Sequence, residues 1–198
     1  MLQKHSTAVS NATPVYVNFE VDFLPVGENG SGDAICIRYG DDSGFYVHVV
    51  DGGYTDTAET IINHITKHYG PNVVIHHMVL SHADDDHARG LIGVLQHFTV
   101  LNLWMNRPWL YCAEVIQHFH GNWTLAGLEK EIKAAHSYLV DLEAIANEKG
   151  TVIHEVFQGA QIGAFTVLAP SRDRYVSLIP DLGKTPDSYA DKSLAGTI

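Results

Sequence analysis

The sequence is short of cysteine, of basic residues and of long hydrophobic runs. Only two of its 198 residues are cysteines, Cys36 and Cys112, and they lie far apart in the chain. Neither belongs to a Cys-x-x-Cys pair, so nothing supports a thiolate metal site or a dithiol redox motif. We expect two buried free thiols, because free cysteine is among the most buried residue types.

Basic residues are outnumbered by acidic ones. Lys and Arg total 12 against 23 Asp and Glu, which gives a formal net charge of −11 at pH 7. A broad surface for nucleic-acid phosphates needs many Lys and Arg side chains, and this composition does not favour one. Small nucleotides and phosphodiesters held by bound metal stay open as substrates, because cations reverse the local field.

Long hydrophobic runs are missing as well. No window approaches the roughly 20 apolar residues that a membrane-spanning helix needs. The first residues, MLQKHSTAVSNATPVYV, lack the continuous apolar stretch of a signal peptide. We therefore expect no membrane partner and a cytoplasmic location.

Hydrophobic periodicity predicts hairpins first and alternating helices and strands afterwards. Strands are expected over 15–26, 34–39, 45–50, 73–80, 100–105, 151–157 and 164–169, and helices over 57–69, around 91–98 and over 124–148. The first three strands suggest an antiparallel meander at a sheet edge. The whole pattern indicates an α/β (α+β layered) fold, with helices packed on a mixed sheet.

The domain boundaries follow from the same pattern. We expect a flexible N-terminus over 1–14, one domain over 15–182 and a weakly patterned tail over 183–198. A helical insertion at about 109–149 interrupts the domain. One domain of this size is ordinary for a chain of this length.

The densest group of ionisable residues is SHADDDHARG, residues 81–90, directly after a β-branched strand. His82, Asp84, Asp86 and His87 are spaced His-x-Asp-x-Asp-His, and imidazole nitrogen and carboxylate oxygen bind divalent zinc, manganese or iron. A short loop does not easily wrap four side chains around one ion. We therefore expect two neighbouring ions, with His82 and Asp84 on one and Asp86 and His87 on the other.

A structural alternative stands beside this interpretation. An Asp-rich loop after a strand is usually a solvated turn, and Asp86 could simply cap the helix that follows. Packed carboxylates without a compensating cation are unfavourable, which favours the metal hypothesis for the group as a whole.

The segment VVIHHMVLSHADDDHARGL, residues 73–91, resembles the signature of the metallo-β-lactamase superfamily, whose usual motif is His-x-His-x-Asp-His. Asp84 stands where the second histidine usually stands. That variant is similar to the branch related to the DNA-uptake competence proteins. VDFLPVGENGSGDAICIRYG and YVHVVDGG upstream, and GAQIGAFTVLAPSRDRY downstream, are also similar to that branch, so the resemblance covers roughly 15–180.

The resemblance implies a metallo-β-lactamase-like αββα sandwich and a metal-dependent hydrolase with a metal-bound hydroxide as nucleophile. It implies two divalent metal ions, zinc foremost, with manganese or iron as alternatives. His82, Asp84 and His87 would be ligands, while Asp86 would bind the second ion and orient the nucleophilic water. Asp51, in the Asp-Gly-Gly turn, would support the metal loop, or would be only a turn aspartate.

The resemblance also implies ligands that the sequence does not contain. In this branch the second half of the sandwich supplies an aspartate from a Gly-Asp pair and a histidine from His-His-Gly, and neither pair occurs after residue 90. We expect His76 and His77 to be satisfied locally within their strand. His154 is the nearest substitute for the absent ligand, but the commoner role of such a histidine, in the core or on the surface, is the one that we expect. From the resemblance we therefore expect the chain to correspond to an N-terminal half, incomplete at its C-terminus, whose open apolar sheet face could promote homo-oligomers.

Two classes of function follow. The first is a hydrolase of phosphodiesters, nuclease-like, with thioester, lactam or small nucleotide-like substrates as other enzyme possibilities. The second is a degenerate or truncated metal-binding module that serves partner association without catalysis. Trp104, Trp109 and Trp123, with Arg107, could line a substrate cleft, although buried packing is the commoner role of tryptophan.

Overall fold

A computed structural model describes residues 18–27, 31–41 and 43–188 of the chain. Its main feature is a six-stranded sheet with the strand order β1-β2-β3-β4-β5-β6. The strands are β1 (Asn18–Phe23), β2 (Ala34–Asp41), β3 (Gly44–Gly52), β4 (Val74–Val79), β5 (Thr99–Trp104) and β6 (Val152–His154). β1, β2 and β3 pair antiparallel, and β3 to β6 pair parallel. The predicted meander at the sheet edge is confirmed.

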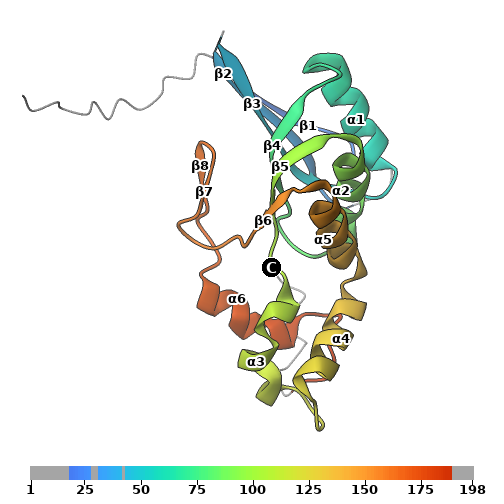
Figure 1. Ribbon diagram of the computed structural model, residues 1–198, viewed down its shortest axis with the longest axis vertical. Helices are drawn as coiled ribbons and strands as arrows, with labels where there is room; N and C mark the ends of the chain where they lie inside the picture. The colour runs from blue at the N-terminus through green and yellow to red at the C-terminus, as the bar shows by residue number, and fades with distance from the viewer. Residues whose placement is uncertain (1–17, 28–30, 42, 189–198) are drawn as a thin grey trace, which may run out of the picture.

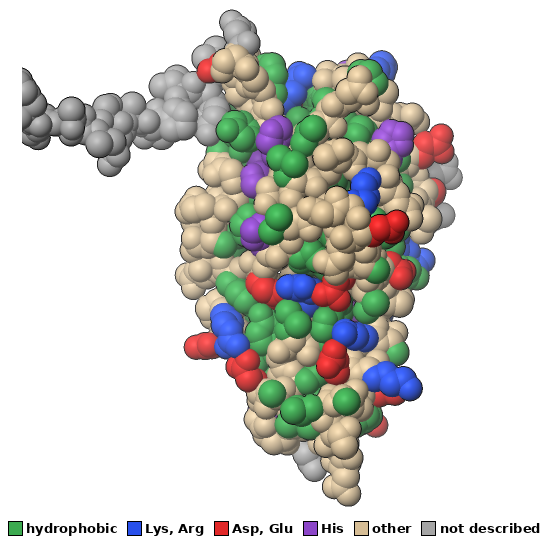
Figure 2. All heavy atoms as spheres, in the orientation of Figure 1, with side chains coloured by type: hydrophobic (Ala, Val, Ile, Leu, Met, Phe, Trp, Pro, Cys, Tyr) green, Lys and Arg blue, Asp and Glu red, His purple; other side chains and the backbone are tan. Residues whose placement is uncertain are grey.

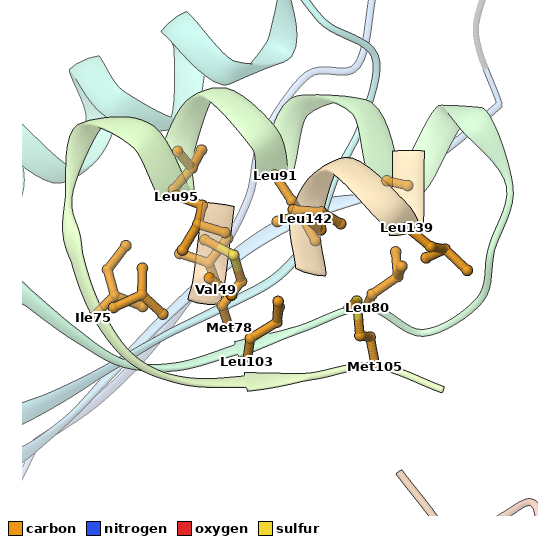
Figure 3. Close-up of a cluster of buried hydrophobic side chains, with 14 of the residues drawn as sticks. Val49, Ile75, Met78, Leu80, Leu91, Leu95, Leu103, Met105, Leu139 and Leu142 are labelled. Atoms are coloured by element: carbon orange, nitrogen blue, oxygen red, sulfur yellow. The ribbon is translucent and has the colours of Figure 1, made fainter. Parts of the chain in front are cut away.

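Three helices cover one face of this sheet (Figure 1). They are α1 (Thr57–His68), α2 (Asp85–His97) and α5 (Ser137–Lys149). Figure 3 shows apolar side chains of α2 and α5, Leu95 and Leu142 among them, facing Val49, Met78 and Leu103 of the sheet. All five are fully buried, so this layer is the core that fixes the strand ends in place.

Lys149 joins the ends of two of these helices. Its ammonium group donates hydrogen bonds to the backbone carbonyls of Leu95, Gln96 and Phe98, at 2.6, 2.9 and 2.8 Å. Those carbonyls belong to the C-terminal turn of α2, where a cation is favourable.

The remaining helices lie beyond the carboxyl ends of the parallel strands, at the bottom of Figure 1. They are η1 (Pro108–Tyr111), α3 (Cys112–Val115), η2 (Ile116–His118), α4 (Leu125–Ala135), α6 (Arg172–Leu178) and η3 (Ile179–Asp181). Arg107 ties this group to the sheet layer through Glu143 of α5, at 2.8 Å, and Glu155 after β6, at 2.9 Å. Arg107 is therefore a structural link in this structure.

The opposite face of the sheet carries a small hairpin, β7 (Gln161–Ile162) and β8 (Phe165–Thr166). The ring of Phe165 lies 6.0 Å from Tyr39 and 5.3 Å from His48, between ring centroids. Farther out on the edge strand, Phe19 and Phe23 are 57% and 75% exposed. In Figure 2, histidine side chains form a column among hydrophobic ones in the upper half of the molecule.

The structure corrects several predicted boundaries. The helix predicted over 124–148 is two helices, because His136 leaves the helical conformation with φ −120° and ψ 50°. The helix predicted around 91–98 begins already at Asp85. The strand predicted over 164–169 is only Phe165–Thr166, and α6 arises where no helix was predicted.

The predicted α/β class is confirmed: a central mixed sheet carries a layer of helices. Both cysteines are buried and free, as expected, and burial raises the pKa of the Cys36 thiol to about 12, with Asp22 contributing. Within the described ranges no helix is long and apolar enough to cross a membrane. Residues 1–14, predicted to be flexible, lie outside the described residues, as does 189–198 of the predicted tail.

Candidate metal centre

The candidate site lies at the carboxyl ends of the neighbouring parallel strands β3 and β4. Asp51 is the penultimate residue of β3. Residues 81–87, here called the metal loop, connect β4 to the first turn of α2. Because parallel strands end at the same sheet edge, residues thirty positions apart meet there. Gly32 allows the upstream loop to approach as well, since a Cβ at that residue would lie 2.3 Å from the backbone oxygen of Asp86.

Two histidine–aspartate pairs form within the metal loop. His82 Nε2 lies 3.5 Å from Asp84 Oδ2, and His87 Nε2 lies 3.9 Å from Asp86 Oδ1. The rings of His82 and His87 are 3.8 Å apart, between centroids. The loop thus places His82 beside Asp84 and His87 beside Asp86.

Asp51 lies beneath these pairs, and its residue is only 3% exposed. Oδ1 accepts the backbone N–H of Ser81 at 2.8 Å, and Oδ2 accepts the Ser81 hydroxyl at 2.5 Å. His87 Nδ1 is 2.9 Å from the same Oδ2. A buried carboxylate that accepts several hydrogen bonds is well satisfied without further partners.

The contact with Asp51 settles which nitrogen of His87 can bind a metal. A carboxylate only accepts hydrogen bonds, so Nδ1 of His87 must donate, and in the neutral ring Nε2 then keeps its lone pair. Nε2 is the nitrogen that points to Asp86. A carboxylate behind a histidine in this way is the usual support of a metal-binding imidazole.

Asp51, His82 and His87 each offer a ligand atom, and these atoms lie within 4.8 Å of one another. The group fits a divalent ion by donor type, since it combines imidazole nitrogen with carboxylate oxygen. Asp51 already accepts hydrogen bonds from the Ser81 backbone N–H, the Ser81 hydroxyl and His87. Among the described residues, Asp84 and Asp86 are not members of this group of three.

The three aspartates of the loop have different surroundings. Asp85 turns away from the histidines and binds Arg89 and Lys184, both at 2.6 Å. Burial alone would raise the pKa of Asp85, but these two cations lower it below its ordinary value. This residue is therefore an anchor for the start of α2, and Lys184 is a contact that the sequence did not suggest.

Asp86 remains ionised for a different reason. Burial would raise its pKa, but the hydrogen bond from the Ser31 hydroxyl, at 2.7 Å, and the nearby rings of His87 and His82 lower it below its ordinary value. Ser31 belongs to the glycine-rich stretch before β2, whose role in the site the sequence did not show. The only sequence feature that could have indicated this contact is the position of Ser31 beside Gly32, which lies against the backbone of Asp86.

The alternative in which Asp86 caps the following helix is wrong. α2 begins at Asp85, its N-cap position is held by Asp84, and Asp84 makes no side-chain capping bond. Asp86 lies within the first turn, where a negative charge is favourable beside the helix dipole. The carboxylate of Asp84 is left exposed and directed to His82.

The other histidines lie outside this group. Nδ1 of His76 accepts the Val47 N–H at 3.2 Å, and Nδ1 of His77 accepts the Trp104 indole N–H at 3.0 Å. Both are satisfied within the sheet, as predicted. His154 stacks on Trp104 with centroids 4.3 Å apart and bonds to Asn102, so within the described residues it is no substitute ligand.

The tryptophans do not share one surface, and for two of them buried packing, the commoner role, holds rather than the lining of a cleft. Trp104 and Trp109 are buried, at 9% and 4% exposure, and the Trp104 indole N–H donates to His77 of the sheet. Trp123 donates to the backbone carbonyl of His120 at 2.8 Å in the loop before α4. Packing is the role that the structure gives to the first two.

Comparison with known proteins gives a limited set of similarities. No protein-family profile matches the chain, and no curated protein sequence matches it. Among solved structures, a candidate metallo-beta-lactamase from Thermotoga maritima has 10% sequence identity and a TM-score of 0.39 over 73% of this chain. A beta-lactamase domain protein from Burkholderia ambifaria has 16% identity and a TM-score of 0.39 over 79% of this chain.

The chain spans 62% and 50% of the lengths of those two proteins.

Proposed function

We propose that this chain is a metal-dependent hydrolase whose centre is the metal loop. The observation that carries the proposal is the pair of facing contacts, His82 with Asp84 and His87 with Asp86, above one buried carboxylate. In metal sites, a ligating histidine usually donates its other ring N–H to a carboxylate, as His87 does to Asp51.

The proposal includes two divalent ions, zinc foremost and manganese or iron as alternatives, because the loop offers imidazole nitrogen and carboxylate oxygen. His82 and Asp84 would hold one ion, and Asp86 and His87 the other. When bound, such ions would act as Lewis acids on the substrate and would lower the pKa of a bound water to a value near neutrality. The chain itself contributes Asp51, which orients the ring of His87, and Asp86, whose Ser31 contact leaves Oδ1 directed at His87.

We infer a phosphodiester substrate, nuclease-like in chemistry, from the resemblance of residues 73–91 to the competence-protein branch. The net charge of −11 favours a small phosphodiester over a long nucleic acid. A thioester or a lactam is the alternative substrate, and a cytoplasmic setting and homo-oligomers remain part of the proposal.

Elemental analysis of the zinc-reconstituted protein, together with turnover of bis-p-nitrophenyl phosphate, tests this function. We expect about two ions per chain and measurable turnover. His82→Ala should lower turnover by roughly 100-fold or more, because even substitutions behind a metal ligand cost about 10–100-fold. His97→Ala, an exposed histidine at the far end of the same helix, is the matched control and should change neither quantity.

The same measurements address the rival function, a metal-binding module for partner association. It is favoured by the exposed apolar side chains of β1, Phe19 and Phe23, which suit a protein contact. Metal binding without turnover of phosphodiester, thioester or lactam probes would support the module. Absence of metal from the wild-type protein would reject both functions.

A further inference from the structure

The hydroxyl of Ser81 lies between the buried carboxylate and the second histidine of the metal loop. It is 2.5 Å from Asp51 Oδ2 and 2.8 Å from His82 Nδ1. Its backbone N–H independently binds Asp51 Oδ1 at 2.8 Å. The side chain therefore has two polar neighbours in addition to the anchor that its backbone makes.

The chemistry of these groups determines the direction of each hydrogen bond. A hydroxyl has one hydrogen, and a carboxylate only accepts, so the 2.5 Å contact needs the Ser81 hydrogen. Nothing is then left for Ser81 to donate to His82. The 2.8 Å contact must use a hydrogen on His82 Nδ1, with the Ser81 oxygen as acceptor.

In the neutral ring, a hydrogen on Nδ1 leaves the lone pair of His82 on Nε2. Nε2 is the nitrogen that faces Asp84, at 3.5 Å. His87 reaches the same state directly, because its Nδ1 donates to Asp51. The carboxylate of Asp51 thus keeps the ring proton on Nδ1 of both histidines, of His87 by direct contact and of His82 through the Ser81 hydroxyl.

We propose that Ser81 is a positioning residue that relays Asp51 to His82 and so keeps His82 Nε2 available for a metal ion. The consequence for binding rests on the proposed function above. The hydrogen bonds of the relay do not require a bound ion.

The two histidines should respond differently to loss of the hydroxyl. The His87 side chain is 10% exposed and bonds Asp51 directly, whereas the His82 side chain is 49% exposed and is tied to the carboxylate only through Ser81. Removing the hydroxyl should free the His82 ring and leave His87 in place. In Ser81→Ala the backbone N–H still anchors the loop to Asp51, so the change is confined to the relay.

The first test is long-range ¹H–¹⁵N NMR of the histidine rings in metal-free protein. Wild type should show His82 with its proton on Nδ1, Ser81→Ala should show His82 shifted towards the Nε2–H form of free imidazole, and Ser81→Thr should restore the wild-type spectrum. His87 should keep Nδ1–H in all three. Ser177→Ala, which removes a serine hydroxyl bonded to the Arg174 carbonyl in α6, is the matched control.

The second test is a zinc titration of the same variants. In Ser81→Ala one of the two dissociation constants should rise about 10-fold, as for other groups that orient a ligand, and the other should change less than about 2-fold. The Thr variant should recover both constants. An unchanged His82 tautomer, or an equal loss at both ions, would overturn the relay.

The two proposals fail in different ways. If wild type binds no metal, the hydrolase proposal fails, while the tautomer of His82 still decides whether the relay exists. If metal binds but Ser81→Ala leaves the ring spectrum unchanged, only the relay is rejected.

Discussion

His76 and His77 in β4, and His82 and His87 in the metal loop, lie close together in the chain but use Nδ1 in opposite ways. In the strand pair, Nδ1 accepts hydrogen bonds from the Val47 N–H and the Trp104 indole N–H. In the neutral rings Nε2 must then carry the proton and has no lone pair for a metal. In the loop pair, Nδ1 donates to Ser81 and Asp51, and Nε2 keeps its lone pair.

The comparison shows that the partner of Nδ1 decides which histidines can bind metal. The histidines of the sheet carry their proton on Nε2 and lie among aromatic rings, whereas the loop histidines keep on Nε2 the lone pair that a metal ion would need. The deciding group in the loop is Asp51, a buried acceptor with 3% exposure. The strand histidines instead face donors, a backbone N–H and an indole N–H.

The largest expected effect breaks the loop side of this comparison. Asp51→Asn replaces one acceptor oxygen by an NH₂ donor, which opposes the donors of Ser81 and His87. We expect both zinc dissociation constants to rise by about 10–100-fold, measured by chelator competition. Asp141→Asn, at an exposed position of α5, is the control, and unchanged affinity in Asp51→Asn would show that the carboxylate does not set the tautomers.

An intermediate effect concerns pH and the strand side. Burial, together with the nearby rings of His77 and His76, lowers the pKa of His48 to about 3. An unfolded histidine takes up its proton near pH 6.5, so below that pH the unfolded state binds more protons. The stability that neutral His48 provides is therefore lost as the pH falls from 6.5 towards 3.

His48→Gln isolates this contribution. Between pH 6.5 and 5, wild type should lose about 2 kcal/mol more free energy of unfolding than the variant. Urea unfolding at half-unit pH steps measures the difference. Parallel curves for the two proteins would mean that His48 is not held neutral by the fold.

The smallest expected effect tests whether the strand histidines, His76 and His77, are independent of the loop histidines, His82 and His87. Trp104→Phe removes the N–H that His77 accepts, and should lower the free energy of unfolding by about 1 kcal/mol. Zinc stoichiometry and affinity should stay as in wild type, because His77 takes no part in the metal loop. Trp123→Phe is the control. A change in zinc affinity for Trp104→Phe alone would show that His77 and the metal loop are coupled.

Much of the fold followed from local patterns. The β-branched run at 73–80 and the amphipathic segment at 57–69 became β4 and α1 within a residue or two at each end. The long helix did not, because the apolar spacing continues through residue 136 and hides the break there. His136 Nδ1 bonds to the Ile132 carbonyl at 2.9 Å, a local contact that spacing does not show.

The sequence by itself determined the four candidate ligands, since His82, Asp84, Asp86 and His87 are close enough along the chain for one loop to present them. The contacts of Asp51 with His87 and with Ser81, and the place of the Ser81 hydroxyl between Asp51 and His82, were decided by the tertiary structure. The reason is physical: parallel pairing of β3 with β4 brings residues thirty positions apart into hydrogen-bond contact. Only that contact selects the nitrogen of each ring that carries the proton.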